Sequence, residues 1–160
     1  KLRVHVNRCG VMAGAGQFGT ADQGIVSFWI GSHARQRPLK YIGFEGTGRQ
    51  VRDALHPDDL TSLILAQISS DVHAGIWNVG GGPKSSFSLA ELTAWAADAF
   101  GPVPVTKEIE ARRYDAPWIM MDSAKVSREF NWTPQHTFDS ILAEVAEHYR
   151  RNPDWLDLSK

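Results

Sequence analysis

The sequence predicts an α/β fold in which short strands alternate with amphipathic helices. Four stretches have the composition of strands bounded by glycine or proline, at residues 2–9, 39–43, 75–79 and 103–109. Apolar residues at helical spacing fill the intervals between them, and this alternation is typical of α/β chains. With 160 residues the chain can bury the core of one domain. Four short strands would form a small sheet.

The first two predicted helices have clear starts or stops. One spans residues 25–35 and ends before Pro38, which cannot continue a helix. The next begins at Pro57, and two acidic residues in its first turn complement the helix dipole. Its expected buried face consists of Leu60, Leu63, Ile64 and Ile68.

Three further helices complete the pattern. Ser88 and Glu91 form a capping box at the start of one, which ends at Gly101. A short helix is expected after Asp122. Thr137 caps the last, whose apolar stripe consists of Phe138, Ile141, Leu142, Val145 and Tyr149.

Composition is that of an ordinary globular protein. Hydrophobic residues make up 42%, and the formal net charge of −1 gives no sign of nucleic acid as a partner. The sequence contains one cysteine, no long apolar run and no signal-peptide pattern, so we expect no membrane partner and a cytoplasmic location. We expect residues 1–160 to form a single domain, with 152–160 as a frayed tail. Because the chain starts at Lys1 inside a strand pattern, we expect it to be a fragment.

Residues 14–19, GAGQFG, match the glycine fingerprint of dinucleotide-binding folds. That fingerprint requires a preceding strand, an immediate helix and an acidic residue roughly 20 positions further on. Only the strand is present, because residues 20–24 delay the helix and residues 36–42 contain no carboxylate. A flexible loop is therefore the favoured interpretation, and its ligand is left open.

One group of residues could be either a metal site or a helix cap. It consists of His56, Asp58 and Asp59, with Asp53 nearby. Imidazole and carboxylate groups are metal ligands, but acidic residues are also favoured in the first turn of a helix. The helix-cap interpretation is preferred, because the six histidines show no paired metal-ligand spacing. We therefore expect no metal site.

Other motifs limit the reactions that the chain could catalyse and the ligands that it could bind. No Gly-x-Ser-x-Gly motif occurs, so a hydrolase nucleophile is missing. The glycines at 80–82 could hold a phosphate, but a tight strand-to-helix connection is preferred because no P-loop Lys-Ser/Thr follows. Arg52 and the pair at Arg112 and Arg113 suit an anionic ligand such as a diphosphate, although each alone is more often a surface charge.

Three segments, taken in the order in which they occur along the chain, resemble the carboxyl-terminal half of the nucleotide-sugar epimerases and dehydratases of the extended short-chain dehydrogenase family. They are GTGRQVRDALHPDDL, IWNVGGGPKSSFSLAEL and RRYDAPWIMMDSAKVSREFNWTP. The loop GAGQFGTADQG is similar to the branch containing CDP-paratose (tyvelose) 2-epimerases. The resemblance covers nearly the whole chain and implies the carboxyl-terminal portion of a Rossmann-type extended fold, a small mixed α/β substrate-binding domain.

The resemblance also implies what the chain lacks. The family's glycine fingerprint and catalytic Tyr-x-x-x-Lys would lie in a missing amino-terminal half. Tyr41, Tyr114 and Tyr149 are not followed by lysine four positions later. No catalytic residue is therefore expected here, and NAD would be bound mainly by the missing half. That half, or a second copy of the chain, is the expected protein partner.

By resemblance, the ligand is a nucleoside-diphosphate sugar. Arg52 and Arg112 would hold the diphosphate, and Asp115 would accept a hydrogen bond from the ribose. Gln23 and Gly24, at a helix start, would contact a phosphate or the base.

The resemblance assigns roles to five more residues. Tyr41 and Ile42 would line the base slot largely through their backbone, and Gln17 and Phe18 would contact the sugar. Cys9 would approach the nicotinamide, with packing as a small buried hydrophobe as the alternative.

The preferred function is the substrate-binding part of an NAD-dependent nucleotide-sugar epimerase, inactive as this chain alone. One alternative is a stand-alone, noncatalytic nucleotide-sugar-binding module. The other is a nucleotide-sugar dehydratase of the same family.

Overall fold

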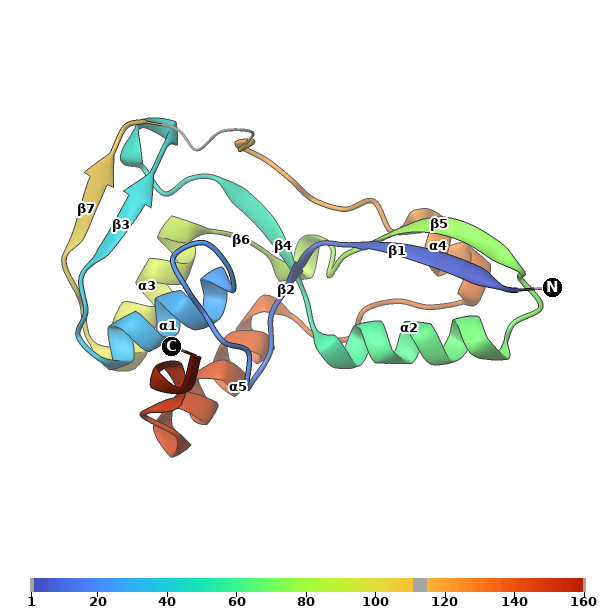
Figure 1. The fold of residues 1–160 in the computed structure, drawn as a ribbon. Helices are drawn as coiled ribbons and strands as arrows, with labels where there is room; N and C mark the ends of the chain where they lie inside the picture. Colours follow the sequence, from blue (N-terminus) through green and yellow to red (C-terminus); the bar gives the residue numbers. More distant parts are fainter. Residues whose placement is uncertain (1, 111–114, 160) are drawn as a thin grey trace.

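The structure is a computed structural model that describes residues 2–110 and 115–159. The fold is mixed α/β, as predicted. The molecule is elongated: one end holds β1, β5, α2 and α4, and the other holds α1, α3, α5 and the β3–β7 pair (Figure 1). The described residues form three small sheets, so the expectation of one small sheet is wrong.

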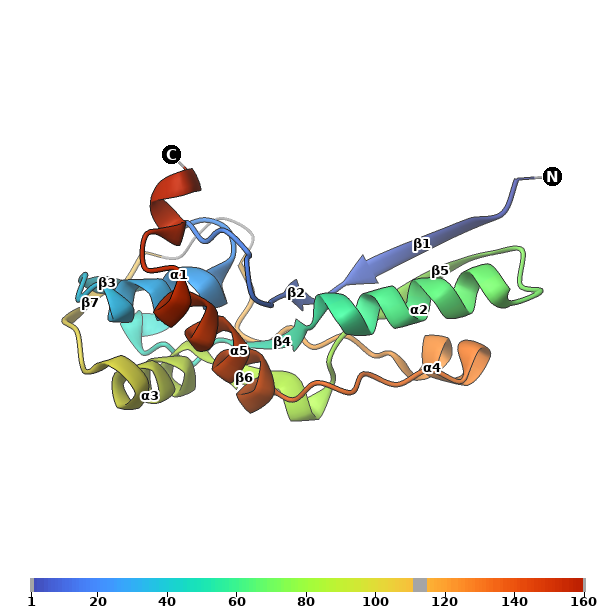
Figure 2. The ribbon, with the colours of Figure 1, turned by 90° about the horizontal axis from the view of Figure 1, so that it is seen from below.

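The end that carries the amino terminus is built on two parallel strands. β1 (Val4–Cys9) pairs with β5 (Ala74–Val79), with Val4 opposite Ala74 and Cys9 opposite Val79. The helices α2 (Pro57–Ser69) and α4 (Ala124–Phe130) lie alongside this pair (Figure 2). Their common core consists of Leu55, Leu63, Trp77, Val79, Val126, Phe130 and Trp132.

The central sheet contains strands that the sequence analysis missed. β4 (Val51–Leu55) pairs in parallel with β2 (Val11–Met12) and antiparallel with β6 (Ser86–Ser88). β4 escaped prediction because Arg52 and Asp53 interrupt its apolar run. The glycines that follow β5 lead through the 3₁₀ turn η2 (Pro83–Ser85) and the short strand β6 into α3, so the expected tight connection between strand and helix contains these two short elements.

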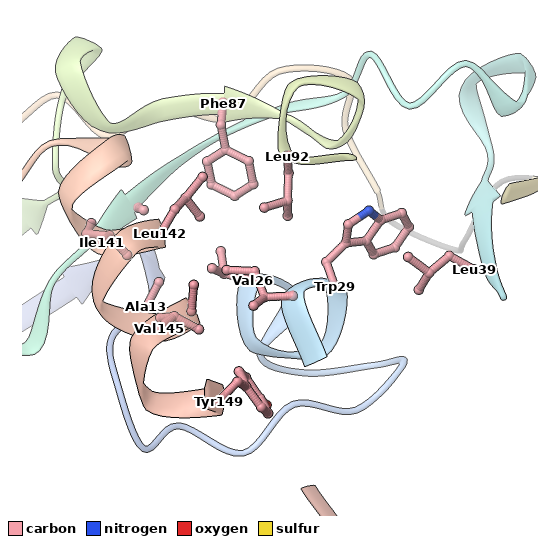
Figure 3. Packing of buried hydrophobic residues seen from close by; sticks show 13 residues of the cluster. Ala13, Val26, Trp29, Leu39, Phe87, Leu92, Ile141, Leu142, Val145 and Tyr149 are labelled. Carbon is pink, nitrogen blue, oxygen red and sulfur yellow. The ribbon is translucent and has the colours of Figure 1, made fainter. Parts of the chain in front are cut away.

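The opposite end contains the larger core. β3 (Leu39–Ile42) pairs in parallel with β7 (Val105–Glu108), and the 3₁₀ turn η1 (Phe44–Gly46) follows β3. The helices α1 (Ile25–Ala34), α3 (Leu89–Phe100) and α5 (Phe138–Arg151) pack together here. Figure 3 shows the side chains that meet between them, which include Ala13, Val26, Trp29, Leu39, Phe87, Leu92, Ile141, Leu142, Val145 and Tyr149.

The predicted helix ends are confirmed by their hydrogen bonds. The Ser88 hydroxyl accepts from the Glu91 amide, and the Glu91 carboxylate accepts from the Ser88 amide. Thr137 caps α5 by accepting from the Ser140 amide. His56 is the N-cap of α2, and its Nδ1 accepts from the Asp58 amide. The helix-cap interpretation of this segment is therefore confirmed.

The apolar face predicted for α2 is only partly buried. Leu63 is fully buried, whereas Ile64 and Ile68 are 41% and 62% exposed. Apolar residues of the adjoining strands are also exposed, namely Val4, Val6 and Ile76. Nothing within the described residues covers this surface, so the prediction that Ile64 and Ile68 are buried is wrong for this chain.

The segment after α5 differs from the expected frayed tail. Trp155–Ser159 forms the 3₁₀ helix η3, and the Trp155 ring stacks on Phe18 at a centroid distance of 4.8 Å. The Arg35 guanidinium donates two hydrogen bonds to the Pro153 carbonyl, at 2.7 and 3.1 Å. These contacts hold the segment against α1 and the preceding loop. Across 2–110 and 115–159, no helix is long and apolar enough to cross a membrane.

Candidate functional site

A cavity of about 840 Å³ lies at the end of the molecule that contains α1, β3 and β7. Its size is within the usual range for small-molecule sites. Polar and apolar groups line it together, including Gln23, Gly24, Ile25, Phe28, Trp29, Leu39, Lys40, Ile42, Gln50, Arg52, Thr106 and Asp115.

The start of α1 forms one edge of the cavity. Gly24 has a φ of 67°, and a Cβ there would lie 2.5 Å from the Phe18 carbonyl oxygen, so glycine is required. The Thr20 hydroxyl accepts from the Gln23 amide, which fixes the turn before the helix. The first turn of α1 therefore presents backbone N–H groups and the positive end of the helix dipole at this edge, an arrangement that favours anions.

Arg52 and Asp115 lie at another edge and contact each other. The Arg52 Nη2 group pairs with Asp115 Oδ1, while Nη1 donates to the Val51 carbonyl at 2.6 Å. The two side chains are only 18% and 23% exposed. The cavity edge thus carries a guanidinium group on the rigid strand β4. Arg112, the second predicted diphosphate ligand, lies outside the described residues.

The residues predicted for the base slot divide into two groups. Ile42 lines the cavity, but Tyr41 does not. The Tyr41 ring stacks on Trp29 at 5.8 Å, and its hydroxyl donates to Thr93 Oγ1 at 2.7 Å. Trp29 Nε1 donates to the same oxygen at 2.9 Å. The Tyr41 side chain therefore supports the cavity wall through Trp29.

Gln17 and Phe18, predicted to contact the sugar, are not among the cavity-lining residues. The side-chain Nε2 group of Gln17 donates a hydrogen bond to the Met12 carbonyl at 3.0 Å, and the Phe18 ring packs on Trp155. Their side chains fold the loop between β2 and α1 against its neighbours.

Cys9 also lies outside the cavity. It is half-buried at the end of β1, with its Sγ 3.8 Å from the Asn7 carbonyl oxygen, and burial raises the pKa of its thiol. This environment fits the packing alternative. Cys9 does not line the cavity beside α1, and no chemical step is assigned to NAD here.

Several cavity residues were missed by sequence reasoning. Trp29 lies on α1, which is apolar on nearly all sides, so the sequence does not mark it as a cavity residue. Lys40 and Thr106 lie on β3 and β7, and neither belongs to a recognisable motif. Gln50 could have been found, because it alternates with Arg52 and such residues share one face of an extended strand. Its Oε1 is buried and has no hydrogen-bond partner among the described residues.

The glycines at 80–82 have a packing role. A Cβ on Gly80 would lie 1.9 Å from Asp53 Oδ2, and one on Gly81 would lie 1.8 Å from the Ala54 carbonyl oxygen. Glycine is needed because β4 passes so close. Asp53 is buried, which raises the pKa of its carboxyl, although a hydrogen bond from the Met121 amide partly offsets the effect. The glycines at 80 and 81 therefore allow β4 to pass close to the end of β5.

No family model matches the chain. It is 30% identical over 139 residues to the CDP-paratose 2-epimerase of Salmonella typhi, and 25% identical over 125 residues to a dTDP-glucose 4,6-dehydratase of Shigella flexneri. These matches cover 84% and 74% of this chain, but only 41% and 34% of the two relatives.

Solved structures agree with the sequence matches. MoeE5 in complex with UDP-glucose and NAD superposes with a TM-score of 0.80 at 26% identity, over 95% of this chain and 48% of that one. DesIV, a dTDP-glucose 4,6-dehydratase from Streptomyces venezuelae, gives 0.81 at 26% identity, over 99% and 47%. The UDP-glucose 4-epimerase of Thermotoga maritima, at 21% identity and a TM-score of 0.82 over 95% and 47%, shows the same fold.

The homologues of this chain are therefore nucleotide-sugar epimerases and dehydratases, and its structural neighbours belong to the extended short-chain dehydrogenase family. The chain matches the carboxyl-terminal half of those structures, and the CDP-paratose 2-epimerase of Salmonella typhi is among its homologues. The recognition made from the three motifs is thus confirmed. The chain spans less than half the length of these curated relatives.

Proposed function

We propose that this chain is the nucleotide-sugar-binding part of an NAD-dependent epimerase. The observation that carries the proposal is the cavity, in which an arginine and a helix start favour an anion while Trp29, Leu39 and Ile42 provide an apolar wall. A nucleoside diphosphate has this mixture of charge and flat apolar surface. The homology to CDP-paratose 2-epimerase supports the same assignment.

The proposed binding mode assigns one part of the ligand to each edge. Arg52 and the start of α1 hold the diphosphate through charge-assisted hydrogen bonds, with Arg112 as a second donor. Asp115 accepts a hydrogen bond from the ribose, and the base lies against the apolar wall near Ile42. Because Arg52 pairs with Asp115 in the chain as described, the diphosphate has to share or replace that contact.

The share of this chain in the reaction is positioning. NAD, which would be held mainly by the other half of the protein, would supply the hydride acceptor and donor of the reaction. Holding the nucleoside diphosphate fixes the distant sugar and converts remote binding energy into orientation. The chain contains no Tyr-x-x-x-Lys, so we expect no turnover from it alone. The catalytic tyrosine and most of the NAD site belong, in this proposal, to another half of the protein.

A dehydratase is the second candidate, because dTDP-glucose 4,6-dehydratases are also among the relatives. Both reactions need the same grip on the nucleotide. A stand-alone binding module is disfavoured by the exposed apolar side chains of Val4, Val6 and Ile76. Such a surface suits coverage by another half of the protein or by a second copy of the chain.

Calorimetric titration tests the proposal. UDP-glucose, dTDP-glucose and CDP-glucose are each added to the chain and to the variant Arg52→Ala. We expect saturable one-to-one binding of at least one ligand and clear weakening in the variant. Absence of binding for all three at millimolar concentration would overturn the proposed function.

A further inference from the structure

Two histidines and a glutamate meet away from the cavity. His56 is the N-cap of α2, His136 lies just before α5, and Glu144 is on α5. One ligand atom from each of these three residues lies within 4.8 Å of the others. The two imidazole rings stack with centroids 3.8 Å apart and planes inclined by 20°. We call these three residues the His56 cluster.

One ring nitrogen of each histidine contacts a carboxylate without making a hydrogen bond. His56 Nε2 is 2.9 Å from Glu144 Oε2, and His136 Nδ1 is 3.1 Å from Asp59 Oδ2. Both nitrogen atoms are buried, and neither contact has hydrogen-bond geometry. Buried polar atoms are normally satisfied, so the Nε2 atom of His56, beside the Glu144 carboxylate, calls for a further partner.

Two further carboxylates, those of Asp58 and Asp59, lie near ring nitrogens of the two histidines. Asp59 is buried, accepts the amides of Gln135 and His136 and lies beside the His136 ring. Asp58 Oδ2 lies 3.9 Å from His56 Nδ1. Metal-bound histidines commonly donate their other ring N–H to a carboxylate, which orients the ring and strengthens the ligand. Each histidine of the cluster therefore has a suitable acceptor for its second nitrogen.

We propose that the His56 cluster binds one divalent cation of the Zn²⁺ type, with His56, His136 and Glu144 as ligands and water in the remaining position. Two imidazoles and one carboxylate form a ligand set that Zn²⁺ accepts. Because imidazole lone pairs lie in the ring plane and the two planes are nearly parallel, one ring has to turn out of the stack when the ion binds. Side-chain exposures of 29% for His136 and 41% for Glu144 leave the ion a path from solvent.

Binding requires a proton shift on His56. Its Nδ1 now accepts from the Asp58 amide at 3.2 Å, so the neutral ring carries its proton on Nε2. When Nε2 donates its lone pair to the ion, the ring changes to the tautomer protonated on Nδ1, and this N–H can donate a hydrogen bond to the Asp58 carboxylate. The ring stays neutral, and the cap hydrogen bond to the Asp58 amide is exchanged for one to the side chain.

The ion would link segments that are distant in sequence. Glu144 Oε2 faces His56, while its Oε1 accepts from the Ala15 amide at 3.1 Å. A cation held by Glu144 therefore connects the start of α2, the segment before α5 and the loop after β2. Its role is structural, and it is independent of the nucleotide cavity because no residue of the cluster lines that cavity.

Zinc titration of the chelator-treated, tag-free chain tests the proposal without any nucleotide. We expect calorimetry to show one Zn²⁺ bound per chain. The affinity for Zn²⁺ should be at least about tenfold lower in His136→Ala and in Glu144→Gln, because even the loss of a group that supports a metal ligand weakens metal binding by about this factor. Zn²⁺ should also raise the unfolding temperature of the unaltered chain, because a ligand that binds only the folded state stabilises it.

Matched variants separate this site from surface binding. His73→Ala removes an exposed histidine, and Glu147→Gln neutralises another acid on α5; both should bind zinc like the unaltered chain. Circular dichroism in chelator verifies that each variant is folded, and if His136→Ala is not, Glu144→Gln decides. Lack of stoichiometric binding, or equal binding by Glu144→Gln and the unaltered chain, would overturn the proposal.

Discussion

Arg52 and Asp115 stand 63 positions apart in the sequence and form an ion pair at the edge of the cavity. The strand β4 fixes the backbone of Arg52, and its Nη1 group is held by the Val51 carbonyl. The contact with Asp115 is made by Nη2. The pair keeps a partly buried guanidinium oriented in the cavity wall, where an anionic ligand can reach it.

Replacing Arg52 by alanine should weaken nucleotide-sugar binding by about 1.5–3 kcal/mol, the usual contribution of a hydrogen bond to a charged group. Lysine should restore part of the loss, because it keeps the charge but lacks the planar fork. Calorimetry measures both variants, and Arg49→Ala, an exposed arginine on the same segment, is the control. Arg112→Ala should resemble Arg52→Ala, and normal binding by both would refute a shared diphosphate site.

Ser88→Ala should destabilise the chain by about 1 kcal/mol, because the variant loses the hydroxyl that caps α3. Glu91→Gln should cost less, since the amide oxygen can still accept from the Ser88 backbone. Urea unfolding of the three proteins gives the comparison. If the alanine variant were as stable as the unaltered chain, the cap would contribute nothing.

Asp53→Asn should flatten the dependence of stability on pH. Burial raises the carboxyl pKa in the folded state above its ordinary value of 3.8, so the folded state binds the proton more tightly than the unfolded state. Stability from this group is therefore greatest at low pH and falls as pH rises from near 3.8 to the folded pKa.

Urea unfolding of the Asp53→Asn variant at a series of pH values measures this slope. Asp98→Asn, which alters an exposed acid on α3, serves as the comparison. The account fails on this point if the asparagine variant loses as much stability between pH 4 and neutrality as the unaltered chain.

Self-association is expected through the apolar surface of α2 and the β1–β5 pair. Leu65 and Ile68 are 60% and 62% exposed there, and clustered apolar groups drive association. Light scattering should show concentration-dependent oligomers that Leu65→Lys and Ile68→Lys reduce. A monomer at all concentrations, unchanged by these substitutions, would contradict the expectation.

Local patterns were enough to predict the helices. The stripe from Ile141 to Tyr149 and the cap at Thr137 define α5 because both signals lie within its own turns. β4 was missed for the opposite reason. Its strand character depends on pairing with β2 and β6, and its charged residues, Arg52 and Asp53, obscure the apolar pattern.

The candidate site was predicted unevenly. Motifs singled out Arg52, Asp115 and the start of α1, which the fold brings to one cavity. Trp29 could not be assigned to the wall, because α1 is apolar on nearly all sides and the sequence does not show which side faces the cavity. The approach of His136 to His56 is a tertiary contact that no spacing rule reveals.

The central claim is that the cavity beside α1 and β4 holds a nucleoside diphosphate. Amide chemical shifts of isotope-labelled chain, recorded during titration with UDP-glucose, dTDP-glucose or CDP-glucose, test it most directly. The account predicts that one of these ligands shifts the amides of Gln23, Gly24 and Ile42, and that Arg52→Ala suppresses the shifts. Saturable shifts confined to residues outside the cavity, or none with any of the three ligands, would contradict it.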